Sequence, residues 1–522
     1  MNNNKRQVIS IISNILSVFV SIGVSFFLTP YLVGTIGKEA YSYYPLANNF
    51  VSYMTIITLA LNSMASRFIT IEITRENEAK AHKYFSSVFY SNIILSLALV
   101  IPMSIIIIFL DRFLNVSTDM LTDVRLLFSC TFVSMLVNLV SSVFGIATFA
   151  KNRMDWRAKR DIGQTLLRAA LLLGLFSLLR PSIVYFGLVA VSVSVVNGLV
   201  QYIFTRKLMP GYRVTVSDFD KTAVFELVKS GIWNSVNNIG SVLTMSVSVL
   251  IANIMIGASE SGDLSIVQTL PHLISSVITA VYGVLLARIT SVFAKNNKEK
   301  TIECVRSSQQ VLGFICSVPA VLVIILGKVF FRLWVPGEDA VHLQILSSIT
   351  MLPVFIHSTM WTIYGLNVTN NKLKTPALTL IGTGIFSIVL TVLLVHFTDL
   401  GTYAITISSS ICNGMFYLFF IPFYAAKKMD TPVMSFYSHI MRSFICAAVL
   451  LLIGLPAMAV LEQYVTSWIA LIICGGFFEM LGLALYWLIV LDRTTRRGLS
   501  AALTERVNAV LKRHGSRSNE IQ

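Results

Sequence analysis

The chain has 522 residues, of which 55% are hydrophobic and only 12% are charged, and its mean hydropathy is +0.76. Soluble proteins carry about 25% charged residues, so this composition excludes an ordinary soluble domain and indicates a protein embedded in lipid. The formal net charge is +15. We attribute it to loops that flank membrane helices and face anionic lipid, and we expect no nucleic-acid partner.

Fourteen apolar segments are each long enough to cross a membrane. The hydrocarbon core of a bilayer is about 30 Å thick, which a helix of roughly 20 residues spans. The first segment follows "MNNNKRQ" and is longer than the apolar part of a cleaved signal peptide, so we expect it to be retained. The predicted membrane helices cover residues 8–33, 45–70, 86–110, 124–149, 161–180, 183–204, 231–257, 264–293, 308–333, 341–368, 375–397, 401–425, 440–461 and 466–490.

The distribution of Lys and Arg predicts the orientation of these helices, because cytoplasmic loops carry an excess of both residues. Basic residues are abundant in the loops on the side of the N-terminus, for instance at 151–160 and 206–229. The opposite loops hold Lys38, Arg112 and few others. We therefore expect both termini in the cytoplasm.

Residues of the same kind recur in the two halves of the chain at a nearly constant spacing. The matched pairs are Ser10 and Ser230, Asn14 and Asn234, Ser21 and Ser241, Gly37 and Gly257, and Arg67 and Arg288. An even number of helices in each half makes both halves enter the membrane from the same side, as in transporters with parallel repeats. We predict an all-α polytopic membrane protein with an N-terminal six-helix lobe at 1–207 and a C-terminal six-helix lobe at 208–429. Two further membrane helices at 430–491 and an amphipathic cytoplasmic tail at 492–522 follow.

Two loops and the arginines that follow them carry a family resemblance. The loops "VGTIGKEAYSYYPLANNF" and "IMIGASESGDLSIVQTL", with "MASRFIT" and "LLARITSVF" after them, resemble the polysaccharide transporter branch of the multidrug/oligosaccharidyl-lipid/polysaccharide (MOP) exporter superfamily. This branch includes the O-antigen flippases called Wzx, and the lipid II flippase is a more distant relative. The resemblance implies a transporter that moves an undecaprenyl-diphosphate-linked oligosaccharide from the inner to the outer leaflet of the bacterial inner membrane by alternating access.

Three arginines are the candidate diphosphate ligands, because ionisable side chains inside membrane helices are costly and point to function. Arg67 and Arg288 lie near the cytoplasmic ends of the second and eighth predicted helices, and Arg168 lies in the fifth. Arg binds phosphate oxygens through paired, charge-assisted hydrogen bonds, and the resemblance implies cavity arginines on helices two and eight. The alternative is that Arg67 and Arg288 extend to the membrane surface and that Arg168 packs at a helix end.

The stretch "SGIWNSVNNIGSVL" places amides at the start of the seventh helix. Its polar positions share one helix face: Asn234, Asn237, Asn238 and Ser241. Asn14 and Ser21 hold the matching places in the first helix. An unpaired amide in hydrocarbon costs about 2–7 kcal/mol, so this stripe faces either a polar cleft or hydrogen-bond partners on neighbouring helices.

Three further polar residues lie inside predicted helices. Asn138 and His357 occupy matching positions of the fourth and tenth helices, where they either form buried hydrogen bonds or contact sugar or a proton. Glu479 lies in the fourteenth helix. It either pairs with a polar group on a neighbouring helix, or binds a proton, or contacts the substrate's lipid tail. The resemblance implies a groove for that tail at the two extra helices.

Alternative functions are disfavoured by what these segments lack. A multidrug cation antiporter of the same superfamily needs acidic cleft residues, and the predicted first, second, seventh and eighth helices contain no interior Asp or Glu. A membrane enzyme needs a larger outer loop than "DRFLNVSTDMLTDVR" or "VPGEDAVH", and no nucleotide or metal motif occurs. We expect no cofactor, while a coupling ion, Na⁺ or H⁺, stays open, as does a scaffold role. The expected partners are the lipid-linked substrate, the membrane, and a polysaccharide polymerase or other envelope-assembly proteins.

Overall fold

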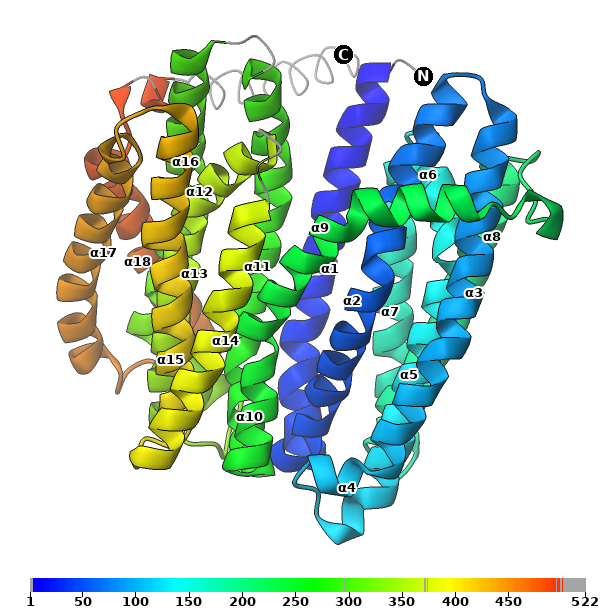
Figure 1. Ribbon diagram of the computed structural model, residues 1–522. Coiled ribbons are helices and arrows are strands. Elements are labelled where there is room, and N and C mark those ends of the chain that lie inside the picture. Colours follow the sequence, from blue (N-terminus) through cyan, green and yellow to red (C-terminus); the bar gives the residue numbers. More distant parts are fainter. Residues whose placement is uncertain are drawn as a thin grey trace, which may run out of the picture. The chain divides into compact units, whose positions relative to one another are not determined.

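The computed structural model describes residues 3–293, 297–369, 372, 374–493, 495–497 and 500. This part of the chain consists of helices joined by short turns (Figure 1). The elements are α1 (Asn3–Ile36), α2 (Lys38–Thr74), α3 (Glu78–Ile108), α4 (Leu110–Phe113), η1 (Thr118–Met120), α5 (Leu121–Ser141), η2 (Ser142–Gly145), α6 (Ile146–Ala150), α7 (Met154–Leu178), α8 (Val184–Leu208), η3 (Val216–Asp218), α9 (Lys221–Met245), α10 (Val247–Met255), α11 (Ala258–Phe293), α12 (Lys298–Trp334), α13 (Ala340–Thr369), α14 (Lys374–Phe397), α15 (Thr402–Met415), η4 (Phe416–Phe420), α16 (Ile421–Met429), α17 (Met434–Leu461) and α18 (Trp468–Ile489). Most of the predicted tail at 492–522, and the side chain of Ser10, lie outside the described residues.

Within the described residues, fourteen helical segments are long and apolar enough to cross a membrane, and each coincides with one predicted segment. The fourteen-helix prediction is therefore confirmed. Several helices extend beyond the predicted apolar run: α2 covers Lys38–Thr74 instead of 45–70, and α7 begins at Met154 instead of residue 161. Hydropathy marks only the stretch that lies in hydrocarbon, whereas backbone hydrogen bonding continues the helix into the polar interface.

The chain divides by its internal contacts into two compact units. Unit 1 comprises Met1–Leu273, Trp334–Pro336 and Leu373–Asn413, and unit 2 comprises Ile274–Leu333, Gly337–Lys372 and Gly414–Gln522. One boundary falls inside α11 and another at the end of α15. The lobes at 1–207 and 208–429 are defined by sequence repetition rather than by contacts, and they stay a prediction.

Close contacts of α9 with α2 and α14 organise unit 1. A Cβ atom on Gly231 would lie 1.9 Å from the carbonyl oxygen of Ala60 in α2. On the other side of α9, a Cβ on Gly240 would lie 2.7 Å from Cγ of Leu380 in α14. Likewise, a Cβ on Gly384 of α14 would lie 2.5 Å from Cβ of Leu243 in α9. Glycine thus lets α9 approach both neighbours more closely than a side chain would allow.

The loop between α8 and α9 is bound to α3 in unit 1. The backbone N–H of Asp220 donates to Oγ of Ser87 at 2.8 Å, and the N–H of Thr215 donates to Oγ of Ser86 at 3.3 Å. The rings of His82 and Tyr212 stack with centroids 4.2 Å apart. This linker between the two predicted lobes is therefore part of the packed structure.

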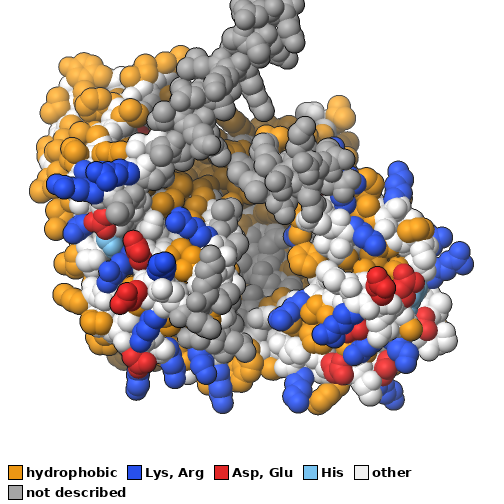
Figure 2. All heavy atoms as spheres, turned by 90° about the horizontal axis from the view of Figure 1, so that it is seen from above, with side chains coloured by type: hydrophobic (Ala, Val, Ile, Leu, Met, Phe, Trp, Pro, Cys, Tyr) orange, Lys and Arg blue, Asp and Glu red, His pale blue; other side chains and the backbone are white. Residues whose placement is uncertain are grey.

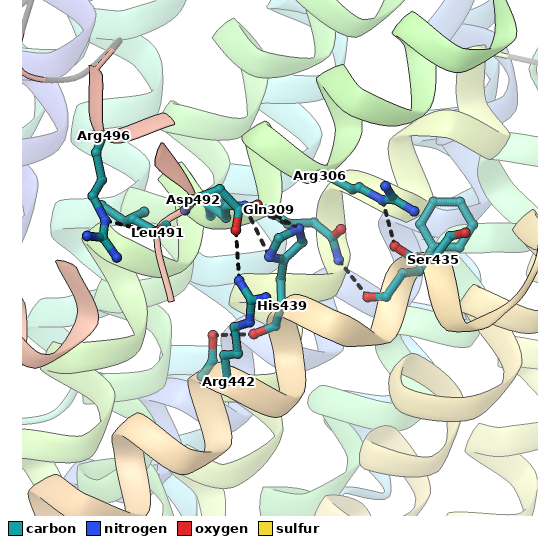
Figure 3. A network of polar contacts seen from close by, with 11 residues as sticks. Arg306, Gln309, Ser435, His439, Arg442, Leu491, Asp492 and Arg496 are labelled. Carbon is teal, nitrogen blue, oxygen red and sulfur yellow. Dashed lines mark hydrogen bonds and ion pairs between the residues drawn. The ribbon is translucent and has the colours of Figure 1, made fainter. Parts of the chain in front are cut away.

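In unit 2, a polar network joins α12, α17 and the segment that follows α18 (Figure 3). The Asp492 carboxylate accepts hydrogen bonds from Gln310 Nε2 and from an Arg442 Nη, each at 2.7 Å. The backbone N–H of Asp492 donates to Gln310 Oε1 at 3.0 Å, and His439 Nε2 lies 3.6 Å from the carboxylate. Burial raises the pKa of Asp492, but the hydrogen bonds from Gln310 and Arg442 outweigh it, so the pKa lies below its ordinary value.

Candidate functional site

A cavity of about 540 Å³ lies within unit 1. Its wall is formed by α1, α2, α7, the start of α8 and the first part of α11. Hydroxyl and amide side chains dominate its polar lining, among them Ser21, Asn48, Asn49, Gln164 and Gln268, and the imidazole of His272 also lines it. Ligand pockets range over about 300–1,000 Å³, so this cavity can hold part of a substrate of moderate size.

One face of α7 supplies the charged part of the cavity. Asp161, Gln164, Thr165, Arg168 and Leu172 all line it. Their spacing of i, i+3, i+4, i+7 and i+11 places them on a single stripe of the helix. Arg168 is fourteen residues beyond Met154, so it lies about 21 Å along the helix at 1.5 Å per residue. The stripe therefore carries polar groups from near the start of α7 deep into the span.

Arg168 is held over an aromatic ring of α2. The carbon atom of its guanidinium lies 5.2 Å from the centroid of the Tyr44 ring. Tyr44 in turn stacks on Phe186 of α8, with centroids 4.6 Å apart. A cation over an aromatic face is attracted by the ring quadrupole. Because Arg168 makes no ion pair among the described residues, its charge is available to an anion in the cavity.

The cavity's own carboxylate is already paired. Asp161 accepts hydrogen bonds from Nη2 of Arg160 at 2.6 Å and from Nε of Arg160 at 3.0 Å. Nε of Arg157 lies 3.9 Å from the other carboxylate oxygen. The charged groups at this end of α7 therefore sum to a positive charge.

The structure places two predicted site residues, Ser21 and Arg168, in the wall of this cavity. Asn14 is exposed on α1, and Arg67 is exposed on α2, but neither lines the cavity. Arg288 is exposed on α11 in the part that belongs to unit 2. The role of Arg67 and Arg288 in binding diphosphate stays a prediction.

The amide stripe of α9 is partly used for helix packing. Asn234 Nδ2 donates to Oγ of Ser63 in α2 at 3.2 Å, one turn from the close contact at Gly231. Asn237, Asn238 and Ser241 are half-buried, and none of them lines the unit 1 cavity. Of the two roles predicted for the amide stripe, a polar cleft or hydrogen bonds between helices, Asn234 has the second.

Asn138 takes part in helix packing between α5 and α8. Its Nδ2 donates to Oγ of Ser194 at 2.8 Å, and its Oδ1 accepts from Asn197 at 3.4 Å. His357 and Glu479 are half-buried in unit 2, on α13 and α18. Among the described residues Glu479 forms no ion pair.

The observed α2 and α11 are longer than the predicted helices at 45–70 and 264–293, and their added ends contain two buried acids. Glu72 belongs to α2 and Asp263 to α11, both of which extend further than predicted. Each acid has basic neighbours: Lys38 Nζ lies 3.0 Å from Asp263 Oδ1, and Arg75 and Lys80 lie 3.5 and 3.9 Å from Glu72. These carboxylates are consequently not free to bind an organic cation.

Unit 1 has several polar contacts at the end where α1 turns into α2, and the Lys38–Asp263 ion pair is one of them. Asn115 and Asn253 exchange hydrogen bonds, with the Asn115 N–H 2.9 Å from Asn253 Oδ1. Tyr53 and Asn49 both donate to the carbonyl of Ser246 at 3.1 Å. Each contact joins a residue of the predicted N-terminal lobe to one of the predicted C-terminal lobe. Asn49 also lines the cavity, so one of these contacts involves the cavity wall.

Sequence reasoning missed most of the cavity wall, including Tyr44, Asn48, Gln268 and His272. The signal for α7 was present, since Asp161, Gln164 and Arg168 have helical spacing. The predicted fifth helix begins at residue 161, so these residues fall in its first turns and are not recognised as one continuous polar stripe.

A family model described as polysaccharide biosynthesis protein matches residues 8–293, which is more than half of the chain. The chain belongs to this family. A protein of Bacillus subtilis (strain 168) named uncharacterized membrane protein EpsK is 29% identical to this family member over 423 residues, covering 80% of this chain and 82% of that protein.

Solved structures show the same fold at low identity. The lipid II flippase MurJ in an inward closed conformation superposes with a TM-score of 0.60 at 15% identity, covering 93% of this chain and 99% of that chain. A multidrug resistance MATE family transporter of the MOP superfamily, in an inward-facing conformation, superposes with a TM-score of 0.59 at 13% identity. This match covers 79% of this chain and 94% of that chain. The predicted polysaccharide family is confirmed, and the chain shares the fold of these two solved structures.

Proposed function

We propose that this member of the polysaccharide biosynthesis family moves an undecaprenyl-diphosphate-linked oligosaccharide from the inner to the outer leaflet of a bacterial inner membrane. The observation that carries the proposal is the cavity of unit 1. It combines a cation, Arg168, with many neutral hydrogen-bonding groups, and its carboxylate Asp161 is already paired with arginine. A diphosphate needs the cation, and sugar hydroxyls need amide and hydroxyl partners.

Arg168 is the best-supported diphosphate ligand of the three predicted arginines, because it lies in the cavity wall. Arg67 and Arg288 are proposed as further contacts along the path, since both are exposed on membrane helices and neither forms an ion pair among the described residues. Asn14, Asn237, Asn238 and Ser241 remain proposed cleft residues, and Glu479 a proposed contact for a proton or the lipid tail.

Alternating access fits the contacts at the α1–α2 turn. Lys38–Asp263, Asn115–Asn253 and the two bonds to Ser246 join the two predicted lobes at the end of unit 1 where α1 turns into α2. Opening this end would require these contacts to break together, which is how a transporter with two lobes exposes its site to one side at a time.

The proposed orientation places both termini in the cytoplasm. Lys and Arg side chains are frequent on the face seen from above in Figure 2. This face includes the ends of helices that the sequence assigns to the cytoplasm, and anionic lipid there attracts basic residues. The end of unit 1 that contains Lys38 and Asp263 then faces the outside. A polysaccharide polymerase or another envelope-assembly protein would receive the product on that side.

The multidrug cation antiporter is the alternative function within the same fold. An organic cation needs an unpaired acid in the cavity, and among the lining residues Asp161 is paired with Arg160 and Arg157. The charge of the cavity thus favours an anionic substrate.

Complementation of a host strain that lacks this gene tests the assignment. Arg168→Ala should abolish or strongly reduce polysaccharide export, and Arg168→Lys should restore part of it, because lysine keeps the charge but loses the bidentate geometry. Arg125→Ala is the matched control, since Arg125 is a partly exposed arginine outside the cavity. Normal export by Arg168→Ala at wild-type protein levels would contradict the diphosphate role of Arg168.

A further inference from the structure

Unit 2 contains a cluster of aromatic side chains contributed by three segments. Tyr282 lies on α11, His357, Trp361 and Tyr364 on α13, and Tyr417 on the turn η4. Trp361 is central: its ring centroid lies 4.1 Å from that of His357, 5.1 Å from that of Tyr364 and 5.5 Å from that of Tyr282. Tyr417 contacts both His357, at 4.7 Å, and Trp361, at 6.1 Å. We call these five residues the aromatic cluster.

Two unusual backbone features build this cluster. Tyr417 belongs to η4, a π-helical turn, and such turns are rare and frequent at functional sites. The hydroxyl of Tyr437 donates to the carbonyl of Leu418 within this turn. On the other side, a Cβ on Gly365 would lie 2.7 Å from Oη of Tyr282, so glycine brings α11 close enough for Tyr282 to reach Trp361.

The cluster also contains two polar atoms for which the described part of the chain offers no hydrogen-bond partner. Nε2 of His357 and Nε1 of Trp361 are both buried, and neither has a hydrogen-bond partner among the residues that the structure describes. Leaving such groups unsatisfied is costly, so each one in a folded protein requires an explanation. The residues His357, Trp361 and Tyr282 are partly exposed, while Nε2 and Nε1 themselves are buried, so a ligand on the exposed part of the cluster reaches these two atoms only when the side chains move apart.

The composition of the cluster selects the chemistry of that ligand. It contains no Lys or Arg to hold a phosphate and no carboxylate to hold a metal ion. It offers aromatic faces, one indole N–H donor and one imidazole nitrogen. A sugar ring matches this set, because its C–H face packs on aromatic rings while its hydroxyls exchange hydrogen bonds with Trp361 and His357.

We propose that the aromatic cluster binds a sugar ring of the lipid-linked oligosaccharide, separately from the diphosphate site at Arg168. This inference rests on the proposed function and adds to it the residues that recognise the sugar. Trp361 supplies the stacking face and an N–H donor, and His357 contributes Nε2 as donor or acceptor according to its tautomer.

The test compares two probes on the purified full chain in nanodiscs. One is the lipid-linked oligosaccharide that accumulates in the host when the gene is deleted, and the other is undecaprenyl diphosphate without sugar. Trp361→Phe keeps a ring and removes Nε1, so it should weaken binding of the first probe about five-fold. Trp361→Ala should weaken it about ten-fold or more, and neither variant should change binding of the second probe.

The control is Trp487→Phe, because Trp487 packs on Phe314 in unit 2, outside the cluster. Equal weakening of both probes, or unchanged binding of the oligosaccharide probe, would overturn the sugar site while leaving a function based on Arg168 intact. Loss of tetraphenylphosphonium binding in Trp361→Ala, with sugar binding unchanged, would assign the cluster to organic cations instead. Failure of the wild-type chain to bind either undecaprenyl probe would refute the proposed function itself.

Discussion

The ion pair between Lys38 and Asp263 allows a quantitative test of what stabilises the α1–α2 end of unit 1. Lys38 Nζ lies 3.0 Å from Asp263 Oδ1, and the two side chains are 27% and 10% exposed. The pair is also tightly packed, since a Cβ on Gly262 would lie 2.6 Å from the Lys38 carbonyl oxygen. Substituting either partner should therefore destabilise the protein.

The magnitude follows from the degree of burial. Exposed ion pairs contribute about 0–1 kcal/mol, whereas removing one partner of a buried pair costs about 3–5 kcal/mol. This pair is intermediate, and a hydrogen bond to a charged group contributes about 1.5–3 kcal/mol. We expect Asp263→Asn and Lys38→Met each to lower the free energy of unfolding by about 1–3 kcal/mol, with the double variant losing little more than either single one.

Thermal unfolding in detergent, followed for the wild type, both single variants and the double variant, measures the coupling. The matched control is the pair of Arg125 and Asp111, whose atoms lie 2.9 Å apart but whose side chains are 38% and 48% exposed. Its coupling should stay below about 1 kcal/mol. Equal coupling energies in the two pairs, or additive effects of Lys38→Met and Asp263→Asn, would refute the reasoning from burial.

Two further predictions concern helix packing and pH. Gly231→Ala should destabilise the protein by about 1–3 kcal/mol, because its Cβ would meet the rigid Ala60 carbonyl. Gly382→Ala, which has open space around it, should be neutral or stabilising by up to about 1 kcal/mol; similar melting temperatures of the two variants would contradict this packing. Asp492→Asn should destabilise at neutral pH, since the folded-state pKa of Asp492 lies below its unfolded value of about 3.9. The contribution is present above about pH 4 and is lost as the pH falls through the lowered pKa, so the wild-type and variant stability curves should converge in acid. A pH-independent difference between them would contradict the network of Figure 3.

The membrane helices could be predicted from the sequence because their signal is local. Each apolar run is set by consecutive residues, and hydropathy located all fourteen segments. The ends were less accurate: α7 begins at Met154, seven residues before the predicted start. This shift matters for function, because it moves Arg168 from near a helix end to the middle of a polar stripe.

The rest of the site depends on contacts between residues far apart in the chain. Lys38 and Asp263 are 225 positions apart, and Asn234 meets Ser63 across 171 positions. No pattern in one sequence specifies such pairs. The π-helical turn at Phe416–Phe420 likewise leaves no periodicity that distinguishes it from an α-helix. The asparagines of "SGIWNSVNNIGSVL" were recognised as unusual, but only the structure shows that Asn234 bonds to α2 beside Gly231.

Transport by the purified chain in liposomes tests the central claim most directly. The substrate is the lipid-linked oligosaccharide, placed in one leaflet, and its arrival in the other leaflet is followed with a membrane-impermeant glycosidase or lectin. The wild-type chain should move the substrate between leaflets, and Arg168→Ala should move it much more slowly while Arg125→Ala behaves as wild type. Movement of a cationic dye without movement of the lipid-linked oligosaccharide would contradict the proposed function.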